Sequence, residues 1–188
     1  MEAVRRIAAA ETALRTGSFL VTMDYGSGVS SSVTILFAGG DGEQPMRLHT
    51  WTTYRAATDT RTVERIALGT LAWERAGNGA WAACRTAPGT ATPSCSLAST
   101  VEDTLWMSWP TRPFSPNAPP GAITREGDSL YWYDAEHDAD MTLRFEPNTG
   151  IPRALRAAMR INGWTIDVDY PGWNTPVSIA PPVAGSLP

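Results

Sequence analysis

Hydrophobic and polar residues alternate along most of the first half of the chain. Every second residue is hydrophobic over 19–25, and the same period of two returns at 33–37 and 46–53. This period is typical of a β-strand that buries one of its faces. Glycine-rich turns at 26–32 and 39–42 separate the runs, as expected for hairpins. We therefore predict an antiparallel meander in which consecutive strands pair.

Shorter runs of the same kind predict the rest of the sheet. Gly77-Asn78-Gly79 and Asn162-Gly163 are strong hairpin-turn signals between two pairs of these runs. A sheet of this kind buries one face and leaves the other in water. With the runs above, the prediction is a sheet of about eleven strands, whose further members are expected at 63–68, 71–75, 81–85, 130–134, 141–145, 153–161 and 164–170.

Two segments break the alternation and predict helices. Residues 2–16 carry hydrophobic side chains at helical spacing, and Gly17 stands where a helix-ending glycine is expected. Residues 99–109 begin with Ser-Thr-Val-Glu, a capping box. The segment 110–121 holds five prolines, the first of which ends this central helix. We expect 110–121 to be an irregular loop.

The composition is that of a folded domain and excludes some functions. The 188 residues are 43% hydrophobic and include eight Trp, which fits one domain over 1–188 with a sizeable core. A net charge of −4 argues against a nucleic-acid partner, which would require a basic face. The chain contains no Lys, so catalysis through a lysine Schiff base is excluded.

Cys84 and Cys95 bear on the cellular location. The loop between them is short and contains two prolines and a glycine, and closing it as a disulfide would add about 3 kcal/mol of stability. We favour this disulfide over two unpaired thiols, and with it an extracytoplasmic location. Residues 1–7 lack the apolar stretch of a signal peptide. The expectation is therefore a protein of the periplasm or cell surface, anchored by a segment outside this sequence.

The residues that could support catalysis or metal binding form no recognisable site. His49 and His137 have no nucleophile beside them, and the sequence Gly-Ser-Gly at 26–28 is not a nucleophile elbow. An acidic cluster does not have the spacing of an EF-hand loop and is interpreted as a hairpin loop. We expect no enzyme, no metal and no cofactor. The cluster comprises Asp134, Glu136, His137, Asp138 and Asp140.

The order of motifs in the second half of the chain carries a family resemblance. Residues 145–152 read Phe-Glu-Pro-Asn-Thr-Gly-Ile-Pro, and two long strands then turn at 162–163. Residues 169–182 follow as Asp-Tyr-Pro-Gly-Trp-Asn-Thr-Pro-Val-Ser-Ile-Ala-Pro-Pro. This order resembles the LolA/LprG/LppX-like periplasmic lipoproteins, and 62–74 with 79–81 are similar to two strands of that family. The chain lacks the N-terminal lipobox cysteine of the mycobacterial lipoproteins.

The resemblance implies an α+β fold and a function. Its fold is a curved antiparallel half-barrel wrapped around two or three helices, with an apolar cavity between them and a proline-ended strap, here 171–182. Members of the family bind lipids, acylated lipoproteins or other acyl-bearing molecules at the bacterial envelope. Related domains serve as sensors in envelope-stress regulators similar to RseB.

From these observations we expect non-catalytic binding of a lipid or acylated ligand, with an envelope membrane or membrane protein as partner. The alternative is a sensor or interaction domain with a closed core, and a small hydrolase would need a catalytic constellation around His49. Each candidate lining residue could equally belong to a fully packed core. Methionines suit a flexible acyl ligand. The candidates are Phe19, Val21, Val33, Ile35, Trp73, Trp106, Met107, Trp109, Met141, Leu143, Met159 and Ile166.

Overall fold

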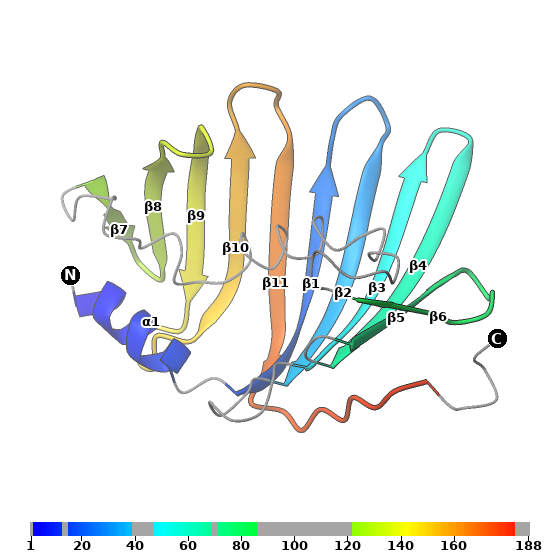
Figure 1. Cartoon of the computed structure of the whole chain (residues 1–188). Coiled ribbons are helices and arrows are strands. Elements are labelled where there is room, and N and C mark those ends of the chain that lie inside the picture. The colour runs from blue at the N-terminus through cyan, green and yellow to red at the C-terminus, as the bar shows by residue number, and fades with distance from the viewer. Residues whose placement is uncertain (1, 13–14, 39–46, 69–70, 86–121, 183–188) are drawn as a thin grey trace.

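The computed structural model describes residues 2–12, 15–38, 47–68, 71–85 and 122–182. In these residues one α-helix lies against an eleven-stranded antiparallel sheet (Figure 1). The helix is α1 (Glu2–Thr12). The strands are β1 (Thr16–Asp24), β2 (Ser30–Ala38), β3 (Arg47–Ala56), β4 (Asp59–Leu68), β5 (Leu71–Ala76), β6 (Ala82–Arg85), β7 (Thr124–Glu126), β8 (Ser129–Asp134), β9 (Ala139–Phe145), β10 (Pro152–Met159) and β11 (Thr165–Trp173).

The order of strands is β6-β5-β4-β3-β2-β1-β11-β10-β9-β8-β7. Every neighbour is consecutive in sequence except β1 and β11, which pair in the middle of the sheet. The predicted antiparallel sheet of about eleven strands is therefore confirmed. The central helix 99–109 and the loop 110–121 lie outside the described residues, so the prediction of two or three helices stays a prediction. Among the described helices none is long and apolar enough to cross a bilayer.

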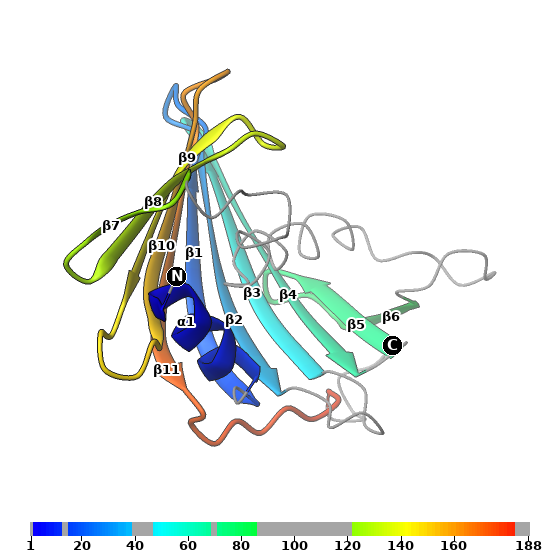
Figure 2. The same ribbon diagram turned by 90° about the vertical axis from the view of Figure 1, so that its left-hand side faces the viewer.

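The sheet has one apolar face, which we call the inner face because α1 lies on it; the opposite side is the outer face (Figure 2). The apolar inner face results from the alternation along each strand, because cross-strand partners such as Val21 and Val33 project to the same side. The buried side chains of the inner face that form one cluster are Phe19, Val21, Met23, Val33, Ile35, Phe37, Leu130, Trp132, Ala139, Met141, Leu143, Phe145, Leu155, Ala157, Ile166, Val168 and Tyr170.

The first helix is shorter than predicted. The described helix covers Glu2–Thr12, and Thr16 already pairs with Ala38 as the first residue of β1, so the predicted helical span 2–16 is wrong at residues 15 and 16. Gly17 is not a helix cap but a strand residue. A Cβ at this position would lie 2.7 Å from the Gly172 carbonyl oxygen and 2.7 Å from Phe37 Cε1. The glycine is thus needed for close strand and ring contact.

The turn between β9 and β10 positions α1 on the inner face. Ala3, Val4 and Ile7 of the helix join the inner-face cluster, with Ile7 fully buried. Gly150 lies in the turn at φ 73°, and a Cβ there would be 2.7 Å from the backbone carbon of Arg6. The turn therefore touches the helix backbone directly. This contact explains why a glycine is required in the Pro-Asn-Thr-Gly sequence.

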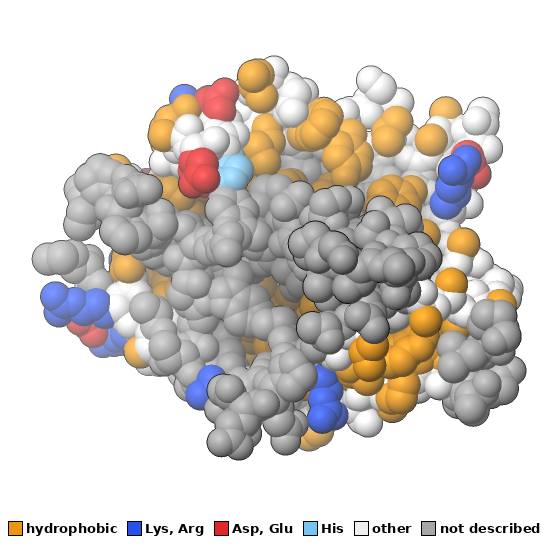
Figure 3. Space-filling view, in the orientation of Figure 1, with side chains coloured by type: hydrophobic (Ala, Val, Ile, Leu, Met, Phe, Trp, Pro, Cys, Tyr) orange, Lys and Arg blue, Asp and Glu red, His pale blue; other side chains and the backbone are white. Residues whose placement is uncertain are grey.

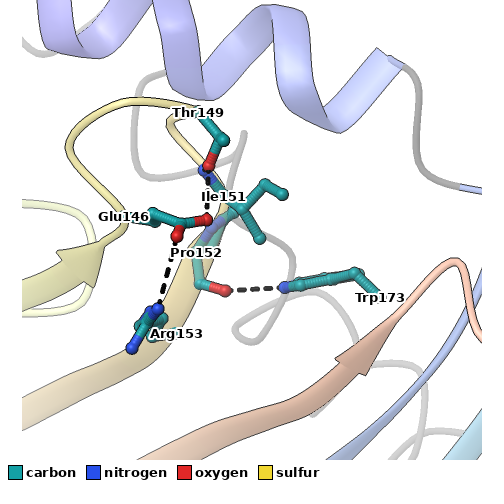
Figure 4. A network of polar contacts seen from close by, with 6 residues as sticks. All are labelled: Glu146, Thr149, Ile151, Pro152, Arg153 and Trp173. Atoms are coloured by element: carbon teal, nitrogen blue, oxygen red, sulfur yellow. Dashed lines mark hydrogen bonds and ion pairs between the residues drawn. The ribbon is translucent and has the colours of Figure 1, made fainter.

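Side-chain hydrogen bonds fix the same turn and join it to β11 (Figure 4). The Thr149 hydroxyl donates to Glu146 Oε2 at 2.8 Å and accepts a hydrogen bond from the Ile151 amide at 3.2 Å. Trp173 Nε1 donates to the Pro152 carbonyl at 2.6 Å. The start of β10 is thereby tied to the end of β11, at the end of these strands near which α1 lies.

The C-terminal strap begins later than predicted, because residues 171–173 belong to β11. We therefore define the strap as residues 174–182, which run beneath β1 to β5 (Figure 1). Asn174, at φ 53°, donates its amide to the Thr16 carbonyl at 2.7 Å. Further along, Ile179 is buried against Ile66 and Trp81. The strap is thus held at its first residue and again at Ile179.

Candidate ligand-binding face

The inner face brings most of the predicted lining residues together. Those that lie on it are Phe19, Val21, Val33, Ile35, Met141, Leu143, Met159 and Ile166. They come from β1, β2, β9, β10 and β11, which are consecutive in the sheet when β1 and β11 are taken as neighbours. The alternation therefore identified one shared surface from segments that are far apart in sequence.

This apolar surface is wider than the helix that lies on it. It spans six strands, from β8 across to β2, or roughly 24 Å at a strand spacing of about 4.8 Å. Helix α1 has 11 residues, so it is about 16 Å long and 10 Å wide. Hydrophobic side chains are visible over the upper strand ends (Figure 3). Of the described elements, α1 alone lies on the inner face, and it covers only part of it.

Trp73 does not belong to this surface, which corrects its selection as a lining residue. It is paired in register with Ile66, whose side chain points to the outer face, and it contacts the cluster of Ile66, Trp81 and Ile179 there. On β5 the inner positions are instead Ala72 and Glu74. Its aromatic character suggested a core position, but the register of β5 decides the face.

Three predicted lining residues and one predicted disulfide cysteine fall outside the described part of the chain. Trp106, Met107 and Trp109 lie outside the described residues, and so does Cys95. The backbone of Cys84 is on β6, paired with Ala72. The three lining residues and the Cys84–Cys95 disulfide accordingly stay predictions.

Aromatic rings close the lower end of the inner face, and three of them, Phe37, Tyr170 and Trp173, are not among the predicted lining residues. The Phe19 ring centroid lies 5.5 Å from that of Phe37 and 5.9 Å from that of Tyr170. Tyr170 stacks on Trp173 at 4.9 Å. Phe37 and Tyr170 lie within the predicted strands 33–37 and 164–170, so the alternation alone places them on the same face as the predicted lining residues.

Beyond β2 the inner face becomes polar. Thr50 and Thr52 on β3 are buried, as is Arg65 on β4, and Arg65 is in register with Thr50 and Glu74. The Thr52 hydroxyl is buried and has no hydrogen-bond partner among the described residues. In the sequence, Arg65 stands two residues from Val63 and two from Ala67, so the alternation of β4 places it on the same face as these hydrophobic residues. This position is the sequence evidence for its burial. The inner face is therefore apolar on one side and polar on the other.

The outer face carries a partly buried network of charged and aromatic groups. Glu64 joins His49 Nε2, at 2.7 Å, to Arg75 Nε, at 2.7 Å. The His49 ring lies 3.7 Å from that of Trp51, and Arg75 lies over Trp81. Burial disfavours the charged form of Glu64, but its hydrogen bonds with His49 and Arg75 outweigh this effect and hold its pKa below the usual value. His49 is thus engaged with a carboxylate and an indole.

The depressed pKa of Glu64 predicts a pH dependence of stability. Its contribution is fully present above the pKa of an unfolded glutamate, about 4.3, and is lost as the pH falls through the lower folded value. Glu64→Gln should cost about 1 to 3 kcal/mol at neutral pH, and its free energy of unfolding should fall less on acidification than that of the wild type. Urea denaturation at several pH values measures both effects. Asp59→Asn, in the exposed pair with Arg61, is the control and should change little.

The acidic cluster forms the hairpin between β8 and β9. Asp134 Oδ2 lies 2.7 Å from His137 Nδ1, and Tyr133 donates to Asp138 Oδ1 at 2.7 Å. Asp140 pairs with Arg160. In the part of the chain that the structure describes, no three His, Cys, Asp or Glu side chains are placed to hold a metal ion. These carboxylates instead organise their own turn.

Comparisons with known proteins identify the fold. LprF from Mycobacterium bovis has a similar structure, with a TM-score of 0.61 and 13% identity over 97% of this chain and 98% of that chain. MucB matches with a TM-score of 0.45 and 13% identity, and this chain spans 61% of it. No protein-family model and no curated protein sequence matches. The chain therefore has the LolA-like sheet architecture that its sequence suggested, at the level of fold.

Proposed function

We propose that the protein binds a lipid or other acyl-bearing ligand, without catalysis, against its inner face at the bacterial cell envelope. The observation that carries this proposal is the width of the apolar surface, which extends over six strands, whereas α1, the one described helix on it, occupies a fraction of it. The similarity in fold to LprF supports it. An extracytoplasmic location, with an anchor outside this sequence, belongs to the same proposal.

The inner face suits an acyl chain in area and in chemistry. An acyl chain laid along it would bury several hundred Å2, worth about 25 cal/mol per Å2 of apolar surface. Met23, Met141 and Met159 lie on this surface, and methionine adapts its shape to flexible ligands. No charged anchor is needed for such binding.

The polar side of the inner face would orient an amphipathic ligand. Thr50, Thr52 and Arg65 are buried beside the apolar strands, and binding sites for small molecules combine an apolar wall with a few such polar groups. A chain lying across β11 and β1 would place its polar end towards β3 and β4. The ligand class that fits is therefore amphipathic and not purely hydrocarbon.

A sensor or interaction domain with a closed core is the second candidate. Its support is the complete burial of several inner-face side chains: Val21, Ile35 and Leu143 have 0% exposure. A surface so well covered could be a packed core. Such a protein would act through its outer face or its edges, and would hold no lipid.

Ligand content distinguishes the two candidates. Native mass spectrometry of gently purified protein, with solvent extraction of the same sample, should reveal a defined mass excess that extracts as acyl lipid. Met159→Gln places an amide of similar size on the inner face and should lower lipid occupancy about tenfold. The matched control is Ala158→Gln, one residue earlier on β10 and on the outer face, which should retain the lipid.

A bare protein mass, unchanged after incubation with detergent-solubilised lipid, would reject lipid binding and favour the sensor domain. Equal loss from both variants would instead show that the inner face is not where the lipid lies. A hydrolase would be indicated only by an activity that His49→Ala abolishes.

A further inference from the structure

Two neighbouring hairpin turns at the upper end of the sheet expose large hydrophobic side chains. Ile161 in the β10–β11 turn is 82% exposed, Trp164 in the same turn is 41% exposed and Val29 at the β1–β2 turn is 40% exposed. We call Val29, Ile161 and Trp164 the tip patch. Residues beside a hairpin turn are commonly polar, so these three need an explanation.

The two turns form a single projection. The ring of Trp164 packs edge-on against that of Tyr25, with centroids 4.9 Å apart, and Asp24 is in register with Thr165. Both turns stand at the apex of the sheet in two perpendicular views (Figures 1 and 2). A Cβ added to Gly26, Gly28 or Gly163 would meet nothing within 4 Å. The tip patch therefore projects into open space on a tightly turned, convex support.

The turns are well ordered by hydrogen bonds and carry almost no charge. Gly26 donates its amide to Asp24 Oδ1 at 2.8 Å, and the Trp164 amide donates to Asn162 Oδ1 at 3.0 Å. Residues 25–29 contain no charged side chain, and in 160–164 the one charge is Arg160, which pairs with Asp140 at 2.9 Å. The two turns thus expose hydrophobic and neutral polar side chains, and their one cation is neutralised; the nearest carboxylate along the chain is the exposed Asp24, which ends β1.

The exposed side chains of the two turns are of the types that proteins place in the outer layers of a bilayer. The aliphatic Ile161 is 82% exposed, Trp164 is 41% exposed and Tyr25 is half-buried. Tryptophan and tyrosine prefer the interface of a membrane, whereas isoleucine prefers its hydrocarbon. Behind them, Tyr25 and Met159 pack on the inner-face cluster, so apolar surface is continuous from the tip patch to the inner face.

We propose that the tip patch docks the protein reversibly on a lipid bilayer, with Ile161 inserted among the acyl chains and Trp164 at headgroup level. The inference rests on the proposed function, because the bilayer would be the source or destination of the bound acyl chain. Arg160 is the one cation of the two turns and is paired with Asp140, so attraction to anionic lipids should contribute little. Docking should therefore be insensitive to salt and as strong on neutral as on anionic vesicles.

The test is flotation of the purified protein with phosphatidylcholine vesicles. The wild type should float with the vesicles at low and high salt, and addition of phosphatidylglycerol should not increase the bound fraction. Ile161→Asn should lower the partition coefficient about tenfold. Leu71→Asn is the matched control, because Leu71 is 51% exposed and lies on β5, away from the turns; it should float as the wild type does.

Three outcomes would overturn docking through the tip patch: a wild type that stays with the solvent, equal loss in the two variants, or flotation that requires vesicles containing membrane proteins. Lipid occupancy after incubation with detergent-solubilised lipid is measured separately on the same proteins. In this assay Ile161→Asn should take up as much lipid as the wild type does, because detergent-solubilised lipid reaches the protein without a bilayer. Vesicle binding by a protein that never holds a lipid would reject the proposed function and leave docking intact.

Discussion

Replacing Phe19 with alanine is expected to lower the free energy of unfolding by about 3 to 5 kcal/mol. Phe19 is 1% exposed and lies on β1, one of the two strands that join the halves of the sheet. Its ring contacts Phe37 on one side and Tyr170 on the other. The substitution removes the ring that connects the aromatic groups at the lower end, and the surrounding strands cannot close the space.

The adjacent position on the same strand provides the control. Leu20 points to the outer face and is 37% exposed, so Leu20→Ala should cost less than about 1 kcal/mol. Urea denaturation followed by circular dichroism measures both. A similar loss in the two variants would contradict the assignment of β1 faces on which the inner face depends.

The face of each long strand could be predicted because the period of two is a property of the backbone. Once Phe19 and Val33 were placed in the apolar phase, cross-strand pairing determined their neighbours. The prediction that Trp73 lies on the inner face is wrong because its aromatic type indicates burial but does not specify the face of the strand. On β5, the phase is set by pairing with β4, and no sequence pattern across the intervening turn specifies that register.

Other errors arose where tertiary contacts override a local signal. Gly17 follows a helical pattern and was interpreted as a helix cap, but its packing on Phe37 and Gly172 accounts for the glycine. Ile161 was assigned to the end of a strand, whereas β10 ends at Met159 and Ile161 lies in the exposed turn. The burial of Arg65 was also missed, because a charged residue gives no sign by type that it will be buried.

The apolar and polar parts of the inner face are specified by the sequence in different ways. The alternation of hydrophobic and polar residues is enough to specify which side chains of β8 to β2 lie on the inner face, which explains why they could be predicted. The polar residues on β3 and β4 depend on which neighbours they meet across the sheet, as Arg65 meets Thr50. Under the proposed function, ligand selectivity would therefore be encoded in strand register and not in the hydrophobic pattern.

Gly150→Ala is expected to have the second large effect, about 3 kcal/mol or more in free energy of unfolding. Gly150 has φ 73°, a conformation that costs an L-residue about 1 to 2 kcal/mol. Its new Cβ would also lie 2.7 to 2.8 Å from backbone and Cβ atoms of Arg6. The helix or the turn must then shift, and overpacking of this kind typically costs about 1 to 3 kcal/mol more.

Gly26→Ala separates the two contributions, because Gly26 has φ 72° and a methyl group added there would meet no atom within 4 Å. It should lose only the conformational part, about 1 to 2 kcal/mol, so the difference between the variants measures the contact between the turn and α1. Hydrogen exchange should show faster exchange of the α1 amides in Gly150→Ala and not in Gly26→Ala. Equal destabilisation, with α1 equally protected in both, would mean that the turn does not hold the helix. Since α1 is the described element that covers part of the inner face, loosening it tests directly what limits access to that surface.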